Sequence, residues 1–294
     1  MTMSGRSDPE RGIDVEAQMT AAIGVGGDGP IGPPDRRRRA PAWAETFPFW
    51  AFLLAAAMGW MGYLVFFNER YELAWDRIYP GLGLTVRITL AGFAIALALG
   101  VVVGLGRVST SIVLRNISRT YVELIRGIPM LILIFTLALV LVPQAAGWLG
   151  YEGNRLSYFW RGSLALAIVY GAYIAEVVRG GVQSIGLGQM EAGRSLGLSR
   201  GQTMRSIVLP QAGRAMMPPL GNDLISMLKD SSLLSVLGVL EITQLGRQHA
   251  AGSFQFRESY MVLVLMYLTM TVLLSFVLHA LERRVSRDRA GERA

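Results

Sequence analysis

Long apolar runs constrain this sequence more than any other feature. A helix needs about 20 mostly apolar residues in a row to cross the hydrocarbon core of a bilayer. We expect six such helices, at about residues 48–67, 84–105, 128–142, 163–178, 207–228 and 260–281. The fifth run is the weakest, because Pro210, Pro218 and Pro219 interrupt it. The pattern predicts an all-α fold, a polytopic membrane helical bundle with about six transmembrane helices.

Composition agrees with a membrane protein and excludes several kinds of site. Of the 294 residues, 52% are hydrophobic and 17% are charged, whereas about a quarter are charged in ordinary soluble domains. The net charge of +7 comes from arginines scattered between the apolar runs, so we expect no nucleic-acid partner. There is no cysteine, and the two histidines, His249 and His279, are far apart. We therefore expect no disulfide, no metal site and no cofactor in this chain.

The basic residues predict the topology, because cytoplasmic loops are enriched in lysine and arginine. With the N-terminus inside the cell, the cytoplasmic segments carry 19 basic residues and the outer segments carry 7. Residues 1–47 are polar, rich in glycine and proline, and lack an apolar core. They predict a disordered cytoplasmic tail and not a secretory signal. Residues 286–294 are expected to form a second cytoplasmic tail.

One polar segment, EAGRSLGLSRGQTMRSIVLPQAGR, interrupts the apolar pattern on the cytoplasmic side, beginning at Glu191. It favours two short helices, since Gly197 can end the first and Ser199 can cap the second. A helix-turn-helix beneath a bundle is a stiff knob that a partner can hold. An ordinary connecting loop is the alternative.

The spacing within residues 191–210 resembles the EAA loop of permease subunits of ABC importers. The family pattern is Glu-Ala-Ala, three residues, Gly, nine residues, Ile, one residue and Leu-Pro. The matching positions are Glu191, Ala192, Gly193, Gly197, Ile207, Leu209 and Pro210. Only Gly193 departs, because the pattern has alanine there. Glycine costs a helix about 1 kcal/mol relative to alanine, so the first short helix is expected to be looser.

The resemblance extends over about residues 81–285. The blocks that carry it are GLGLTVRITL, YVELIRGIPMLI, AYIAEVVRGGVQSIGLGQ, LPQAGRAMMPPLGNDLISMLKDSSLLSVLGVLEIT and LERRV. They are similar to the polar amino acid branch of these importers, which serves histidine, glutamine, glutamate, arginine and related substrates. The resemblance implies a five-helix permease domain over residues 81–285. The helix at 48–67 is then an extra N-terminal transmembrane helix.

The resemblance also implies partners and a location. Two permease subunits, identical or different, would form the pathway in the bacterial inner membrane, surrounded by membrane lipid. Cytoplasmic ATPase subunits would bind ATP and Mg and grip the EAA loops, and an extracytoplasmic binding protein would deliver the amino acid. The chain itself has no phosphate-binding loop, because its only lysine, Lys229, follows a leucine. We therefore expect a transport subunit and not an enzyme.

Charged residues in the spans are candidate functional groups. Glu176 and Arg179 are three residues apart and share a helix face, and Glu123 and Arg126 repeat this spacing. Near the cytoplasmic ends of spans, Glu176 and Arg179 either form an ion pair that fixes the helix at the interface or line the inner mouth of the pathway.

The stretch PPLGNDLISMLKDSSLLS, residues 218–235, is expected to break its helix. Irregular backbone at membrane depth often marks a transporter's substrate site. Asp223, Lys229 and Asp230 are therefore expected to line or gate the pathway, and their opposite charges suit an amino acid. The alternative is a structural kink whose charges reach the outer interface.

Two other classes of protein compete with this interpretation. A secondary transporter driven by an ion gradient would also have broken, charged spans, but it does not account for the EAA spacing. A membrane enzyme is suggested by Gly197-Leu198-Ser199-Arg200-Gly201, which fits the nucleophile elbow G-x-S-x-G. That motif requires a strand-turn-helix, whereas helices are expected here, so we interpret the match as chance.

Overall fold

The computed structural model describes residues 49–151 and 156–291, with the backbone alone for Trp50, Leu187 and residues 284–291. The expected tail at 1–47 lies outside the described residues. Of the expected C-terminal tail, residues 286–291 continue the last helix, and the rest lies outside. Residues 53–294 form one compact unit, and the arrangement below is that of this unit.

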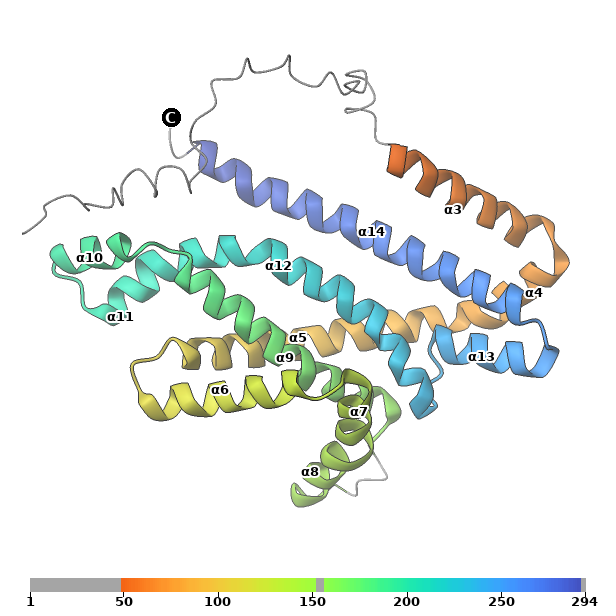
Figure 1. Cartoon of the computed structure of the whole chain (residues 1–294), viewed down its shortest axis with the longest axis horizontal. Coiled ribbons are helices and arrows are strands. Elements are labelled where there is room, and N and C mark those ends of the chain that lie inside the picture. Colours follow the sequence, from red (N-terminus) through yellow and green to blue (C-terminus); the bar gives the residue numbers. More distant parts are fainter. Residues whose placement is uncertain (1–48, 152–155, 292–294) are drawn as a thin grey trace, which may run out of the picture. The chain divides into compact units, whose positions relative to one another are not determined.

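Every regular element in the described part of the chain is helical (Figure 1). The α-helices are α3 (Phe49–Phe67), α4 (Glu69–Ile78), α5 (Leu82–Arg107), α6 (Ile112–Gly127), α7 (Met130–Phe135), α8 (Val142–Trp148), α9 (Tyr158–Gln183), α10 (Leu187–Ser195), α11 (Arg200–Thr203), α12 (Leu209–Asp230), α13 (Ile242–Ser253) and α14 (Phe256–Gly291). Short 3₁₀ segments are η1 (Tyr79–Gly81) and η5 (Ser231–Leu237), and π-helical segments are η2 (Thr136–Leu141) and η4 (Met204–Val208).

Four helical stretches are long and apolar enough to cross a membrane, namely Glu69–Arg107, Met130–Trp148, Tyr158–Gln183 and Phe256–Arg283. They correspond to the second, third, fourth and sixth expected spans. The apolar part of α3, Ala51–Phe67, is shorter than these four. Helix α12 occupies the position of the expected fifth span, residues 207–228. The all-α membrane bundle is confirmed, with approximately the expected number of helices.

The expected break in the fifth span is wrong, because α12 is one continuous helix with Pro218 and Pro219 inside it. A proline inside a helix lacks its N–H and its ring crowds the carbonyl four residues earlier, but a helix packed between neighbours tolerates both. On one side, Met227 is fully buried in the core that α12 shares with α9. On the other, Gly221 leaves room for α14, since a Cβ there would be 3.3 Å from Cδ1 of Leu278.

The main core lies between α5, α6, α7, α9 and α12, and its most extensive contact joins α5 to α9. Gly100 and Gly104 form this contact. A Cβ on Gly100 would be 2.5 Å from Cγ2 of Ile174, and one on Gly104 would be 2.5 Å from Cβ of Val178. Only glycine allows the two backbones to approach so closely. The small-residue spacing in α5 therefore serves packing within the subunit.

A second apolar cluster joins the C-terminal half of α3 to α4, α13 and α14. Val65 of α3 is buried and belongs to the same cluster as the fully buried Ile78 of α4 and Ile242 of α13. The end of α3 is thus packed into the molecule.

Candidate functional site

Residues 187–208 form a helical knob after the end of α9 (Figure 1). It consists of α10, α11 and η4, which pack against one another. The turn between them is built from two caps. Gly197 adopts the left-handed conformation (φ 82°), and the N–H of Leu198 donates to the carbonyl of Gly193 at 3.1 Å. This is the glycine end that the sequence predicted for the first short helix.

Ser199 then caps α11 as expected. Its hydroxyl accepts from the N–H of Gln202 at 3.3 Å, and its own N–H donates to the Gln202 side chain at 2.8 Å. This reciprocal capping box holds the start of the helix. Since Ser199 is a helix cap in an all-helical setting, the nucleophile-elbow match is a chance one.

Gly193 lies where the two short helices cross. A Cβ on Gly193 would be 2.5 Å from Cγ2 of Thr203, which is fully buried, and 3.1 Å from Cδ1 of Ile207. The glycine therefore permits a close contact, and the expected loosening of α10 is offset by packing.

The remaining residues of the EAA pattern differ in exposure. Glu191, Ala192, Gly197 and Pro210 are exposed, whereas Ile207 and Leu209 are half-buried. Leu196, between the two caps, is 81% exposed. The knob thus presents an acidic side chain from α10 and an apolar side chain from the turn that follows it.

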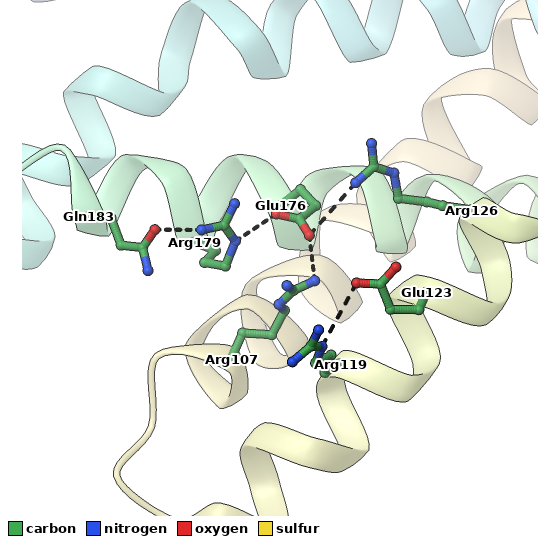
Figure 2. A network of polar contacts seen from close by, with 7 residues as sticks. All are labelled: Arg107, Arg119, Glu123, Arg126, Glu176, Arg179 and Gln183. Atoms are coloured by element: carbon green, nitrogen blue, oxygen red, sulfur yellow. Dashed lines mark hydrogen bonds and ion pairs between the residues drawn. The ribbon is translucent and has the colours of Figure 1, made fainter.

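A second polar group surrounds Glu176 where α5, α6 and α9 meet (Figure 2). Its carboxylate accepts from Nε of Arg179 at 2.7 Å and from Arg107, and lies 3.7 Å from Nη1 of Arg126. The expected pair of Glu176 and Arg179 is confirmed.

On α6, Glu123 and Arg126 have the same three-residue spacing but do not pair with each other. Glu123 lies 4.0 Å from Nε of Arg119, and Arg126 turns to Glu176 on another helix. The sequence does not show this, because α6 and α9 are distant in the chain and meet only through packing.

The guanidinium of Arg126 also lies 5.8 Å from the ring centroid of Tyr173, whose ring is 5.7 Å from that of Tyr170. The hydroxyl of Tyr170 donates to Oδ2 of Asp230 at 2.5 Å. A chain of ion-pair, cation–π, ring and hydrogen-bond contacts therefore runs from the Glu176 cluster along α9 to the end of α12. Sequence reasoning missed both tyrosines, because tyrosine is common in apolar helices and carries no charge.

Asp223 lies two turns before Asp230 on α12. One of its carboxylate oxygens, Oδ2, is buried and has no hydrogen-bond partner among the described residues. Lys229 is exposed and does not pair with Asp230. The three expected charges are thus separated. The carboxylates of Asp223 and Asp230 lie near Tyr170 of α9, whereas the ammonium of Lys229 is exposed and pairs with neither.

Glu241 is a fully buried carboxylate that the sequence analysis did not single out. It caps α13 by accepting from the N–H groups of Thr243 and Gln244 at 2.9 and 2.8 Å, and it accepts from the hydroxyl of Tyr267 at 3.1 Å. Burial raises its pKa to about 7. The N–H of the next residue, Ile242, donates to Thr85 of α5 at 3.3 Å. Glu241 thus fixes the start of α13 between α5 and α14.

No group of acidic, histidine or cysteine side chains in the described residues could hold a metal ion.

Comparison with known proteins gives consistent matches. The family described as binding-protein-dependent transport system inner membrane component matches residues 96–287. The glutamine transport system permease of Escherichia coli K12 is 37% identical over 221 residues, which are 73% of this chain and 98% of that protein. A probable glutamine ABC transporter permease of Bacillus subtilis is 36% identical over 220 residues, which are 75% of this chain and 96% of that protein.

Solved structures agree. A crystal structure of an amino acid ABC transporter with histidines matches with a TM-score of 0.63 and 31% identity, over 71% of this chain and 94% of that one. An inward-facing methionine ABC transporter matches in fold, with a TM-score of 0.54 and 23% identity, over 72% of this chain and 94% of the other.

Proposed function

The chain belongs to the family of binding-protein-dependent transport system inner membrane components, and from this premise we propose that it forms the membrane pathway of an ATP-driven importer for a polar amino acid. The observation that carries the proposal is the 37% identity to a glutamine permease over 98% of that protein's length. An arginine permease of Bacillus subtilis, 30% identical over 93% of its length, supports the same substrate class.

The knob supports a role in coupling. We propose that a separate ATPase subunit, which binds ATP and Mg, grips residues 191–210 through the exposed Glu191 and Leu196. Gly193, Gly197, Ile207, Leu209 and Pro210 would keep the knob rigid and join it to α12, with Ala192 on the exposed face. Backbone caps and close packing make such an element stiff enough to transmit force.

The α9–α12 interface supports a role in the pathway. The unpartnered oxygen of Asp223 is an acceptor of the kind that a substrate ammonium needs. Asp230, held by Tyr170, would be the second acidic group of the pathway, and the exposed Lys229 would supply a positive charge for a carboxylate. Glu176 and Arg179 would line its inner mouth.

The remaining assignments concern partners and orientation. The excess of arginine in alternate segments supports cytoplasmic termini and a cytoplasmic knob. A second permease subunit and an extracytoplasmic binding protein would complete the importer. The family match favours this function over that of an ion-driven secondary transporter.

Purification and uptake test the proposal. The tagged full chain, produced with its neighbouring genes, is expected to copurify with an ATPase, and vesicles containing the complex should accumulate labelled amino acid only with ATP. A Glu191→Lys chain is the control and should lose the ATPase. Uptake by the chain alone under an ion gradient would refute the proposal.

A further inference from the structure

A basic cleft lies between the knob and the ends of two membrane helices. Its volume is about 640 Å³, and its lining includes the last residue of α5 (Arg107), the start of α6, the end of α9 and both short helices of the knob. This cleft is separate from the α9–α12 interface proposed for the pathway.

Four arginines line the cleft, and its lining has no acidic residue. They come from four elements: Arg107 from α5, Arg115 from α6, Arg194 from α10 and Arg200 from α11. Arg107 is balanced by Glu176. The other three are exposed and have no acidic partner among the described side chains of residues 49–151 and 156–283. Positive charge from α6, α10 and α11 thus converges without a counter-charge from the described side chains.

The rest of the lining is largely apolar, with valine, isoleucine and methionine side chains such as Val182, Ile185 and Met204. The stretches Glu69–Arg107 and Tyr158–Gln183 both end at this cleft, and both are long and apolar enough to cross a membrane. The last helix of each stretch, α5 and α9, has 26 residues and is about 39 Å long, which exceeds the hydrocarbon core of about 30 Å, so we expect the helix ends at this cleft at the depth of the lipid headgroups. An apolar floor beneath a cationic rim at that depth suits a molecule with an anionic head and an acyl chain.

We propose that this cleft binds the phosphate headgroup of an anionic phospholipid, such as phosphatidylglycerol, from the cytoplasmic leaflet. The choice of leaflet rests on the orientation proposed above. A bound phosphate would join Arg194 and Arg200 of the knob to Arg115 of α6, and so fix the knob against the membrane. Coupling between the ATPase and the pathway would then depend on anionic lipid.

Lipid retention by the purified full chain tests this. The chain is incubated with equal amounts of phosphatidylglycerol and phosphatidylcholine and washed, and the bound lipids are measured by mass spectrometry. The cleft variant is Arg115→Gln/Arg200→Gln. The matched control is Arg119→Gln/Arg205→Gln, which removes two exposed arginines, one from α6 and one from the knob, outside the cleft lining. Size-exclusion chromatography confirms that both variants are folded.

Wild type and control are expected to retain phosphatidylglycerol in excess. Each arginine near an anionic headgroup contributes about fivefold in affinity, so the cleft variant should bind about 30-fold more weakly. Equal retention in all three chains, or an equal loss in the control, would overturn the proposal.

Two further outcomes identify another occupant. Displacement of phosphatidylglycerol by millimolar inorganic phosphate would make the cleft a site for a soluble anion. Loss of the copurifying ATPase from the cleft variant, with unchanged lipid retention, would assign the cleft to that protein. Lipid retention needs no transport, so a chain that bound phosphatidylglycerol but imported no amino acid would contradict only the proposed function.

Discussion

Gly193 shows how one residue can depart from a pattern and still fit its structure. The family pattern has alanine at this position, but here a methyl group would meet the buried Thr203. The side chain of Thr203 is branched at Cβ and bonded to the carbonyl of Ser199 at 3.0 Å, so it does not yield easily.

We expect Gly193→Ala to destabilise the knob, because overpacking costs about 1–3 kcal/mol and exceeds the gain of about 1 kcal/mol in helix propensity. Thermal unfolding of the purified chain should show a lower Tm. Adding Thr203→Ser removes the colliding methyl group and keeps the hydroxyl, so the double variant should recover. An unchanged or higher Tm for the single variant would contradict this packing.

The carboxylate of Asp223 has a buried oxygen, Oδ2, that accepts no hydrogen bond from the described residues. Asp223→Asn keeps the shape but removes the charge, and a hydrogen bond to a charged group is worth about 1.5–3 kcal/mol. Uptake by vesicles containing the importer should therefore fall about tenfold or more, with normal ATPase attachment. The exposed Asp76 on α4 provides the control, since Asp76→Asn should transport normally. Full uptake by the Asp223 variant would remove this residue from the pathway.

Glu241 predicts a pH dependence of stability. Its pKa of about 7 in the fold exceeds the ordinary value of 4.5, so the folded chain binds this proton more tightly than the unfolded chain. The resulting stability is full below about pH 4.5 and is lost as the pH rises through 7. Tyr267 is the titratable group that faces it.

Glu241→Gln should therefore show a smaller fall in Tm between pH 5 and pH 8 than the wild type. The amide oxygen can still accept from the N–H groups of α13. The same fall in both chains would assign the pH dependence to other groups.

Glu176 joins three helices, α5, α6 and α9, through one carboxylate. Glu176→Gln leaves Arg107, Arg126 and Arg179 without their counter-charge, and we expect a loss of about 1–3 kcal/mol, because the cluster is only partly buried. Glu123→Gln is the matched control, since its pair is exposed and 4.0 Å apart and should contribute below about 1 kcal/mol. The Tm of each variant is measured, and the Glu176 variant should show the larger decrease. Equal shifts would mean that the cluster does not hold the helices together.

Features that depend on neighbouring residues were predicted from the sequence better than contacts between helices that are distant in the chain. The caps at Gly197 and Ser199 depend on a few neighbouring residues, so the sequence carries them completely. The continuity of α12 through Pro218 and Pro219 depends on α9 and α14, and the partners of Arg126 and Tyr170 depend on packing across helices. Such contacts have no local signal.

Helix α3 lies before the part of the chain that matches the family. The family match begins at residue 96, and the structure packs the end of α3 onto α4, α13 and α14 through Met61, Leu64 and Val65. We expect replacement of residues 49–60 by an unrelated apolar helix, with Arg36 to Arg39 kept, to leave uptake unchanged.

A second exchange that also replaces residues 61–67 should lower Tm, because it removes this packing. Expression and membrane insertion are measured for both chains. Loss of uptake in the first exchange at normal expression would show that α3 takes part in transport.

The unbroken α12 has a mechanical consequence. It starts directly after the knob and ends at Asp230, and 22 residues at a rise of 1.5 Å make a rod about 33 Å long. A tilt of about 5° at the knob displaces the far end by about 3 Å, which is the length of a hydrogen bond. With the orientation proposed above, a tilt imposed at the knob would therefore move Asp223 and Asp230 directly, because both lie on this one continuous helix.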